Sequence, residues 1–248
     1  MTDTVIIIPT RLEAKRLPNK PLKKINNKEM ILHVYEAAKK AKIGPVVVAS
    51  PNNQIHDLIS SNNGTCVITQ NEHHTGTDRI FEVFNKFLNK KPKVIINLQG
   101  DMPNIDPESI KMLANYMSKN VCDIATLASK FENELEIRNP NNVKVQTDNL
   151  LKNNQFGRCI DFFRNEENSR TKYIYHHIGI YAFTKEALLR YVSLERTKKE
   201  LSRNLEQLRA LENNMKIHVG YTSSAPLSID TKEDLIAVRE LMTNYEKN

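Results

Sequence analysis

In the first half of the chain, short apolar runs alternate with segments of helical spacing. Each apolar run is rich in β-branched residues, which is typical of a strand buried on both faces of a parallel sheet. The predicted strands span residues 5–8, 45–49, 65–69 and 93–98, and the helices between them span 30–38, 53–61 and 78–88. This alternation predicts an α/β fold with three layers: a mostly parallel sheet with helices on both faces.

The second half of the chain follows a less regular pattern. Strands are predicted over residues 123–129, 143–146, 173–183 and 215–221, and helices over 199–212 and 231–242. The polar segment 147–172 predicts an excursion that is mobile or involved in dimerisation. We therefore expect a single α/β domain over residues 1–248 with a smaller embedded lobe over residues 130–183.

Composition limits the classes of partner. The 248 residues carry a net charge of +7, which is compatible with anionic ligands. The basic residues are scattered rather than interleaved with aromatic residues, so we expect no nucleic-acid partner. The three cysteines lie far apart without a CxxC motif, as is typical of free thiols in a reducing compartment. With no apolar run near the length of a membrane span, we expect a cytoplasmic protein without a membrane partner.

A basic loop follows the first strand, which Pro9 ends because proline cannot donate to the ladder. Arg11, Lys15, Arg16 and Lys20 lie within ten residues of one another in this loop. The carboxyl end of a strand is where α/β sheets bind ligands, and clustered cations suit a polyanion such as a nucleoside triphosphate. The alternative is a solvated basic loop.

Two acids stand at positions typical of a metal site. Asp101 directly follows a buried strand beside Gly100, and Asp230 stands just before the last predicted helix. Two carboxylates together with substrate phosphates are a donor set that suits Mg²⁺. Each acid also has a purely structural alternative, since Asp101 fits a turn and Asp230 fits a helix start.

The segment 75–79 combines small hydroxyl residues with Gly76 at a predicted helix start. Backbone N–H groups at such a start can meet a base edge or a phosphate, although a simple helix cap explains the pattern equally well. The adjacent histidines at 73–74 and 176–177 point to opposite faces of an extended chain, so we expect no zinc site.

Seven motifs in order resemble the CMP-Kdo synthetase family, the 3-deoxy-manno-octulosonate cytidylyltransferases, over almost the whole chain. They are Ile8-Pro9-Thr10-Arg11 together with Arg16-Leu17-Pro18-Asn19-Lys20-Pro21-Leu22, then Thr75-Gly76-Thr77-Asp78-Arg79, Gln99-Gly100-Asp101-Met102-Pro103, the segment 139–145, His177-Ile178-Gly179-Ile180-Tyr181, the segment 205–209 and a closing segment at 230–235. The resemblance implies a nucleotidyltransferase that joins Kdo to the α-phosphorus of CTP and releases pyrophosphate.

The resemblance also implies the role of each residue. Arg11, Lys20, Asp101 and Asp230 are the expected catalytic residues, and the two aspartates would hold the Mg²⁺ cofactor. The expected nucleotide-binding residues are Pro9, Thr10, Arg11, Arg16, Lys20, Thr75, Gly76, Thr77, Arg79 and Gln99. The expected sugar-binding residues are Gln99, Arg164, His177, Tyr181, Glu206 and Gln207. A homodimer is expected on the resemblance alone.

Several positions depart from the family pattern. Asn19 replaces a glycine, but asparagine tolerates positive φ, and Ala14 replaces a small hydroxyl residue. On the sugar side, Asp161 and Phe163 stand where tyrosine and serine are usual, and Arg203 stands where an acid is usual. These changes leave open a cytidylyltransferase for another acid sugar, such as a neuraminate-like one, or a nucleotide-binding homologue with reduced or lost turnover.

Overall fold

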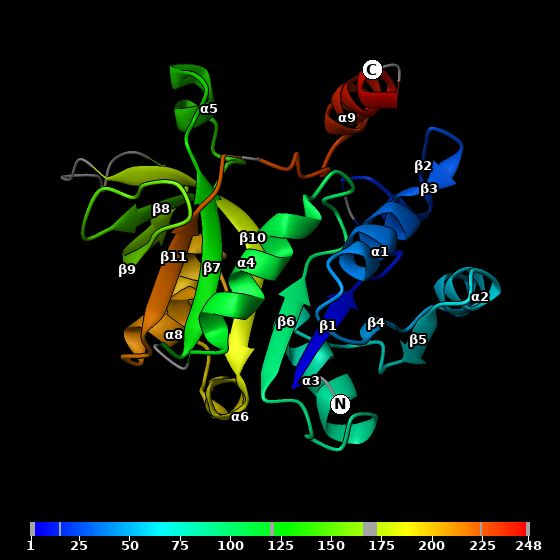
Figure 1. The fold of residues 1–248 in the computed structure, drawn as a ribbon, viewed down its shortest axis with the longest axis horizontal. Coiled ribbons are helices and arrows are strands. Elements are labelled where there is room, and N and C mark those ends of the chain that lie inside the picture. The colour runs from blue at the N-terminus through cyan, green and yellow to red at the C-terminus, as the bar shows by residue number, and fades with distance from the viewer. Residues whose placement is uncertain (1–2, 15, 120–121, 166–172, 224, 247–248) are drawn as a thin grey trace. The chain divides into compact units, whose positions relative to one another are not determined.

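The computed structural model describes residues 3–14, 16–119, 122–165, 173–223 and 225–246 (Figure 1). Within these ranges the chain divides into two compact units. Unit 1 comprises residues 1–92, 96–111 and 226–248, and unit 2 comprises residues 93–95 and 112–225. Unit 2 contains the whole segment 130–183, for which a lobe was expected, and extends beyond it on both sides.

Unit 1 contains the parallel part of the fold. Its strands are β1 (Thr4–Pro9), β4 (Val46–Ser50), β5 (Thr65–Ile68) and the end of β6 (Val94–Leu98), in the order β5-β4-β1-β6. β1 pairs in parallel with β4, and β4 with β5. Every residue from Val5 to Ile8 is fully buried, so both faces of β1 are covered, as the continuous apolar run predicts.

The helices of unit 1 lie close to the predicted positions. They are α1 (Met30–Lys40), α2 (Asn53–Ser61), α3 (Gly76–Lys86), the start of α4 (Pro107–Met117) and α9 (Lys232–Glu246). A 3₁₀ turn, η1 (Lys20–Leu22), and a small hairpin of β2 (Lys24–Ile25) and β3 (Lys28–Glu29) precede α1. The hairpin was not predicted, although Asn26 and Asn27 at φ 47° and 64° are typical of its tight turn.

Unit 2 pairs its strands mainly antiparallel, so the parallel arrangement expected from the sequence applies to unit 1 and the whole is a mixed α/β fold. Its strands are β7 (Ile124–Ser129), β8 (Lys144–Thr147), β9 (Phe156–Phe163), β10 (Ile174–Thr184) and β11 (Ile217–Tyr221). β10 runs antiparallel to β7 and β8, and β9 runs antiparallel to β8 and β11. β11 and β7 are parallel.

Two predictions in unit 2 are wrong in part. The segment 147–172 contains β9, because buried Gly157 and Cys159 alternate with the more exposed Phe156, Arg158 and Ile160 and give this part of the strand an inner face; residues 166–172 lie outside the described part of the chain. The helix expected over 199–212 is two helices, α7 (Lys198–Arg203) and α8 (Leu208–Glu212), because Asn204 adopts the left-handed conformation. The helices α5 (Glu134–Arg138) and α6 (Lys185–Ser193) were not predicted.

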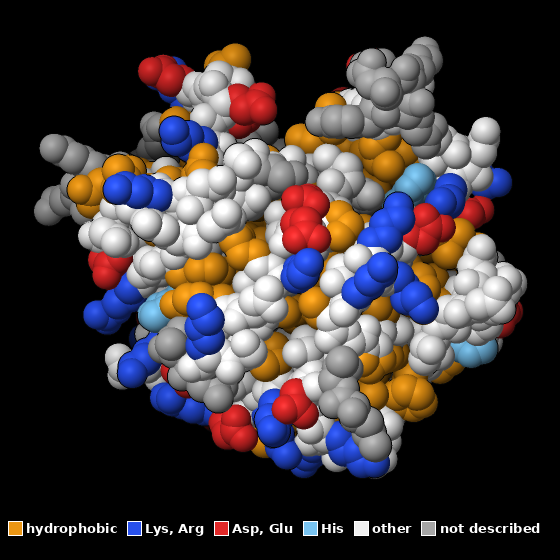
Figure 2. All heavy atoms as spheres, viewed as in Figure 1, with side chains coloured by type: hydrophobic (Ala, Val, Ile, Leu, Met, Phe, Trp, Pro, Cys, Tyr) orange, Lys and Arg blue, Asp and Glu red, His pale blue; other side chains and the backbone are white. Residues whose placement is uncertain are grey.

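The structure also bears on the expectations about surface charge, free thiols and membrane spans. On the face that Figure 2 shows, Lys and Arg side chains are interspersed with Asp and Glu rather than gathered in one patch. Cys66, Cys122 and Cys159 are free thiols, as predicted, and the last two are buried. None of the helices in the described part of the chain is long and apolar enough to cross a membrane.

Candidate active site

A cavity of about 460 Å³ in unit 1 opens at the carboxyl end of β1 and β6. Its lining includes eight of the ten residues predicted to bind the nucleotide, together with Asp101. The predicted residues that line it are Pro9, Thr10, Arg11, Lys20, Thr75, Gly76, Arg79 and Gln99. The lining of the cavity also includes residues that were not predicted to bind the nucleotide: Glu13, Ala14, Pro21, His73, His74 and Gly100. The volume is within the usual range for a small-molecule site.

Two glycines let the segments around this cavity approach one another closely. A Cβ on Gly76 would lie 3.2 Å from the Gln99 amide nitrogen, and a Cβ on Gly100 would lie 3.3 Å from the carbonyl oxygen of Pro9. Because such contacts are tighter than those of most side chains, a larger residue at either position would push the segments apart. The glycines therefore define the spacing between the end of β1, the start of α3 and the end of β6.

Three of the four residues predicted to act in catalysis meet at one point, and the fourth, Arg11, lines the cavity. The ammonium nitrogen of Lys20 lies 3.0 Å from Oδ2 of Asp101 and 3.1 Å from Oδ1 of Asp230. Arg16 adds a second cation, 2.8 Å from Oδ2 of Asp230. Burial lowers the pKa of Lys20, but attraction by the two aspartates outweighs burial and the pKa lies above its usual value.

This arrangement fits a divalent cation. Asp101 and Asp230 each direct one carboxylate oxygen at the same positive group, so the two oxygens already face a common point. Mg²⁺ prefers one or two such carboxylates supplemented by phosphate oxygens and water. Among the described residues, no group of three or more His, Cys, Asp or Glu side chains is placed to hold a metal ion.

The end of the chain places Asp230 beside Asp101. The amide of Ile229 donates a hydrogen bond of 3.0 Å to the carbonyl oxygen of Asp101. Ile229 is fully buried in a cluster with Leu17, Ile25, Met30, Leu235 and Val238. Thr231 and Asp234 form a capping box, in which the Thr231 amide lies 2.8 Å from the Asp234 carboxylate. These contacts fix the start of α9 and hold Asp230, which precedes it, beside Asp101.

The basic loop is ordered by a left-handed residue. Asn19 has φ 55° and ψ 32° and precedes η1, which carries Lys20. Asparagine therefore supplies the conformation for which a glycine is usual at this position. The Asn19 amide also donates to the carbonyl oxygen of Leu12, which closes the loop between β1 and η1.

The segment 75–79 has both a capping role and a place in the cavity. Thr75 caps α3 through a capping box with Asp78, so the helix-cap interpretation is confirmed. Thr77 is almost fully buried and accepts a hydrogen bond from Asn97, and it does not line the cavity. The guanidinium of Arg79 donates to Thr69 and to the carbonyl oxygens of Gln70 and Asn71. Arg79 thereby orders the chain that leads to the two histidines.

His73 is fixed by a carboxylate that the sequence analysis did not single out. Its Nε2 lies 2.7 Å from Glu82 of α3, which also accepts from the amide of Gln70 and from Lys86. Burial raises the pKa of Glu82, but these hydrogen bonds outweigh burial and the pKa lies below its usual value. Glu82 and His73 are nine residues apart and only Glu82 lies on α3, so helical spacing does not reveal their contact.

In unit 2, His177 is buried and held by a defined hydrogen bond. Its Nε2 lies 2.9 Å from the hydroxyl oxygen of Thr126, and that hydroxyl donates to the carbonyl oxygen of Ile180 at 2.7 Å. A hydroxyl has one proton, so Thr126 accepts from His177 and the imidazole carries its proton on Nε2. Burial, followed by the nearby His176 and Arg164, lowers the pKa of His177 to about 3. The ring is neutral, and Nδ1 is left as an acceptor.

The other predicted sugar-binding residues of unit 2 share this environment. The ring of Tyr181 lies 5.4 Å from that of His177. Burial raises the pKa of Tyr181, the carboxylate of Glu206 raises it further, and Arg164 opposes this effect. Gln207 is buried beside Glu206. These residues bring hydrogen-bonding groups and one cation together, as recognition of an acid sugar requires.

A buried lysine fixes Arg164 and the segment 139–145. The ammonium of Lys144 is within 3.0 Å of the carbonyl oxygens of Asn139, Asn142 and Arg164. In return, the guanidinium of Arg164 donates to the carbonyl oxygens of Pro140 and Asn141. Backbone carbonyls thus compensate the charge of a lysine that is fully buried.

Comparison with known proteins agrees with this geometry. Residues 5–217 match the cytidylyltransferase family. The 3-deoxy-manno-octulosonate cytidylyltransferase of Bartonella henselae is 40% identical over 241 residues, covering 97% of this chain and 98% of that protein. The protein of the same name from Rhodopseudomonas palustris is 40% identical over 244 residues, covering 98% and 99%.

Solved structures extend the likeness to the fold. CMP:2-keto-3-deoxy-manno-octonic acid synthetase complexed with CTP is 32% identical to this chain, with a TM-score of 0.87 and coverage of 98% of this chain and 99% of that one. A cytidylyltransferase from Leptospira borgpetersenii shares the fold at 15% identity, with a TM-score of 0.65. The α/β fold predicted from the sequence is therefore confirmed, and the chain belongs to the cytidylyltransferase family.

Proposed function

We propose that this protein is a 3-deoxy-manno-octulosonate cytidylyltransferase, which forms CMP-Kdo and pyrophosphate from CTP and Kdo for lipopolysaccharide synthesis. The observation that carries the proposal is the meeting of Lys20, Asp101 and Asp230 beside a cavity lined by the predicted nucleotide-binding residues. In the reaction, the anomeric oxygen of Kdo forms a bond to the α-phosphorus, and the bond from that phosphorus to the pyrophosphate oxygen breaks.

The roles of the residues follow from charge and position. Arg11, Arg16 and Lys20 would hold the triphosphate and neutralise the charge that develops on the departing pyrophosphate. Asp101 and Asp230 would hold Mg²⁺, which supplies positive charge at the phosphates when bound. Phosphoryl-type transfer depends mainly on positioning and charge stabilisation, so this group of residues does not need a side-chain nucleophile.

The sugar side of the proposal rests on unit 2. Arg164 would attract the carboxylate of the acid sugar, and the neutral His177 would accept a hydrogen bond from a sugar hydroxyl through Nδ1. The resemblance to the family further supports a cytoplasmic location and a homodimer. Light scattering coupled to size-exclusion chromatography measures the molar mass in solution and so tests the dimer directly.

The direct test is pyrophosphate release from CTP and Kdo in the presence of Mg²⁺. A panel of other acid sugars, including a neuraminate, tests the identity of the acceptor. Release with Kdo alone supports the proposal, whereas release only with another acid sugar would reassign the substrate. Binding of CTP in calorimetry without turnover on any sugar would identify a nucleotide-binding homologue instead.

A variant tests the metal assignment. Asp101→Asn is expected to abolish pyrophosphate release with little change in the melting temperature, since it removes one charge from a solvent-accessible group. Asp57→Asn is the matched control, because the Asp57 side chain is 79% exposed on α2. Full turnover by Asp101→Asn would contradict the role of this carboxylate.

A further inference from the structure

Asp161 and Arg203, the two charged residues of unit 2 that differ from the family pattern, lie in direct contact. Nη1 of Arg203 is 2.8 Å from both carboxylate oxygens of Asp161 and 2.8 Å from the carbonyl oxygen of Phe162. Oδ1 of Asp161 also accepts from the Phe162 amide at 2.9 Å. Both side chains are about four-fifths covered, with exposed fractions of 22% and 23%. Arg203, which stands where an acid is usual, is thus paired with Asp161, which stands where tyrosine is usual.

This pair connects the two segments that carry the predicted sugar-binding residues. Asp161 lies on β9 three residues before Arg164, and Arg203 is the last residue of α7, three residues before Glu206. A shift of either segment would move a group predicted to contact the acid sugar. The pair is therefore placed to control the distance between these segments.

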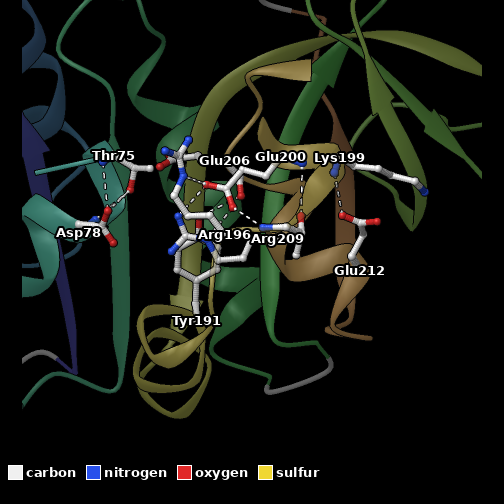
Figure 3. A network of polar contacts seen from close by, with 10 residues as sticks. Thr75, Asp78, Tyr191, Arg196, Lys199, Glu200, Glu206, Arg209 and Glu212 are labelled. Atoms are coloured by element: carbon white, nitrogen blue, oxygen red, sulfur yellow. Dashed lines mark hydrogen bonds and ion pairs between the residues drawn. The ribbon is translucent and has the colours of Figure 1, made fainter. Parts of the chain in front are cut away.

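The residues that follow α7, Leu205 and Glu206, are also held by hydrogen bonds to α6 and α7. The hydroxyl of Tyr191 on α6 donates to the carbonyl oxygen of Glu206 at 2.9 Å, and the Leu205 amide donates to the carbonyl oxygen of Glu200. Figure 3 shows Glu200 between Arg196 and Arg209, and Arg209 above the ring of Tyr191. These contacts link the segment to α6 and α8, and the Arg203–Asp161 pair links it to β9.

The geometry points to Arg203 and Asp161 as positioning residues that fix Glu206 and Gln207 relative to Arg164 for the acid sugar. The inference rests on the proposed function. Both carboxylate oxygens of Asp161 contact Nη1 of Arg203, so the charge of Asp161 is directed at this partner. A charge-assisted contact with several acceptors has a defined direction, so it orients the attached backbone more strictly than an apolar contact does.

The test is steady-state kinetics of pyrophosphate release by Arg203→Met and Asp161→Asn. Each variant keeps most of the side-chain volume and removes one charge of the pair. Each should raise the KM for the acid sugar about tenfold, while the KM for CTP stays within about twofold of wild type. The double variant should resemble the single variants, because both changes remove the same interaction. Arg203→Lys should restore part of the lost affinity.

Arg138→Met is the matched control in the same unit, since it breaks an exposed i,i+4 pair with Glu134 and should leave both KM values unchanged. An acid-sugar KM that is unaffected in the folded single variants overturns the inference. So does an equal rise in both KM values, or a loss of melting temperature without a change in KM, since these indicate a purely structural pair. If Arg203→Met does not fold, Asp161→Asn decides the question.

The failure of the proposed function would be recognisable separately. A wild-type protein that releases no pyrophosphate overturns the proposed function and the inference that rests on it. An active wild type whose single variants keep the wild-type KM for the acid sugar overturns only the positioning role.

Discussion

The buried His177 predicts a specific loss of stability at mildly acidic pH. The folded protein holds this imidazole neutral, with a pKa lowered from 6.5 to about 3, whereas the unfolded chain protonates it near its ordinary value. Between these two pKa values the unfolded state binds more protons, so the free energy of unfolding falls as the pH falls below about 6.5. Each pH unit in that window corresponds to about 1.4 kcal/mol, which gives about 2 kcal/mol at pH 5.

Urea unfolding near pH 7.5 and about pH 5 measures this effect in wild type and in His177→Gln. Glutamine keeps a donor for the Thr126 hydroxyl but does not titrate. The difference in unfolding free energy between the two pH values should therefore be smaller in the variant by about 2 kcal/mol. His56→Gln, which changes an exposed histidine on α2, should retain the wild-type dependence. An identical dependence in wild type and His177→Gln would refute the reasoning.

Three further variants test other parts of the structure. Glu200→Gln should lower the unfolding free energy by about 3 kcal/mol in urea, because it leaves buried Arg209 without its anionic partner. Asn19→Val should lose about 1–2 kcal/mol in the same measurement, whereas Asn19→Gly should not, because φ is 55°. Lys20→Met should reduce pyrophosphate release by about a hundredfold or more, and Lys28→Met, which affects an ion pair with Glu36, should not. Unchanged values in the first two variants, or full turnover in the third, would contradict the corresponding assignment.

The sequence predicts the parallel strands well because burial on both faces has a simple signature. Val5–Ile8 is continuously β-branched, and it is fully buried in β1. β9 was missed because it carries the charged residues Arg158 and Asp161, which made the segment look like a polar loop. Its alternation of buried and exposed residues was a period-2 signal that charge obscured.

The break between α7 and α8 could not be predicted from helical spacing. Leu205 and Leu208 continue an amphipathic pattern, but Asn204 at φ 52° turns the chain between them. Asparagine occupies this conformation in many places along the chain without always ending a helix. Whether it does so depends on tertiary contacts such as that between Arg203 and Asp161, which no local pattern contains.

The meeting of Asp101 and Asp230 also could not be derived from spacing, since it depends on the burial of Ile229 and on a backbone hydrogen bond from that residue to Asp101. Their positions at the end of a strand and before a helix suggested a Mg²⁺ pair, and the resemblance to a family supported it, but each acid also had a structural alternative. The basic loop was predicted to hold the triphosphate, but the contact of Lys20 with both aspartates was not predicted. Charge explains this contact, because burying Lys20 or either aspartate without an oppositely charged partner would cost free energy.

The balance of charge around the cavity explains why a divalent cation suits the proposed reaction. Among the described residues, the charged side chains that line or adjoin the cavity are four cations and three carboxylates: Arg11, Arg16, Lys20, Arg79, Glu13, Asp101 and Asp230. This near neutrality does not match a triphosphate, which carries about four negative charges at neutral pH. A divalent cation bound by Asp101 and Asp230 would add two positive charges and would replace Lys20 and Arg16 as counter-ions of the aspartates. Both side chains would then be available to phosphate oxygens, so binding of the metal and of the nucleotide would favour each other.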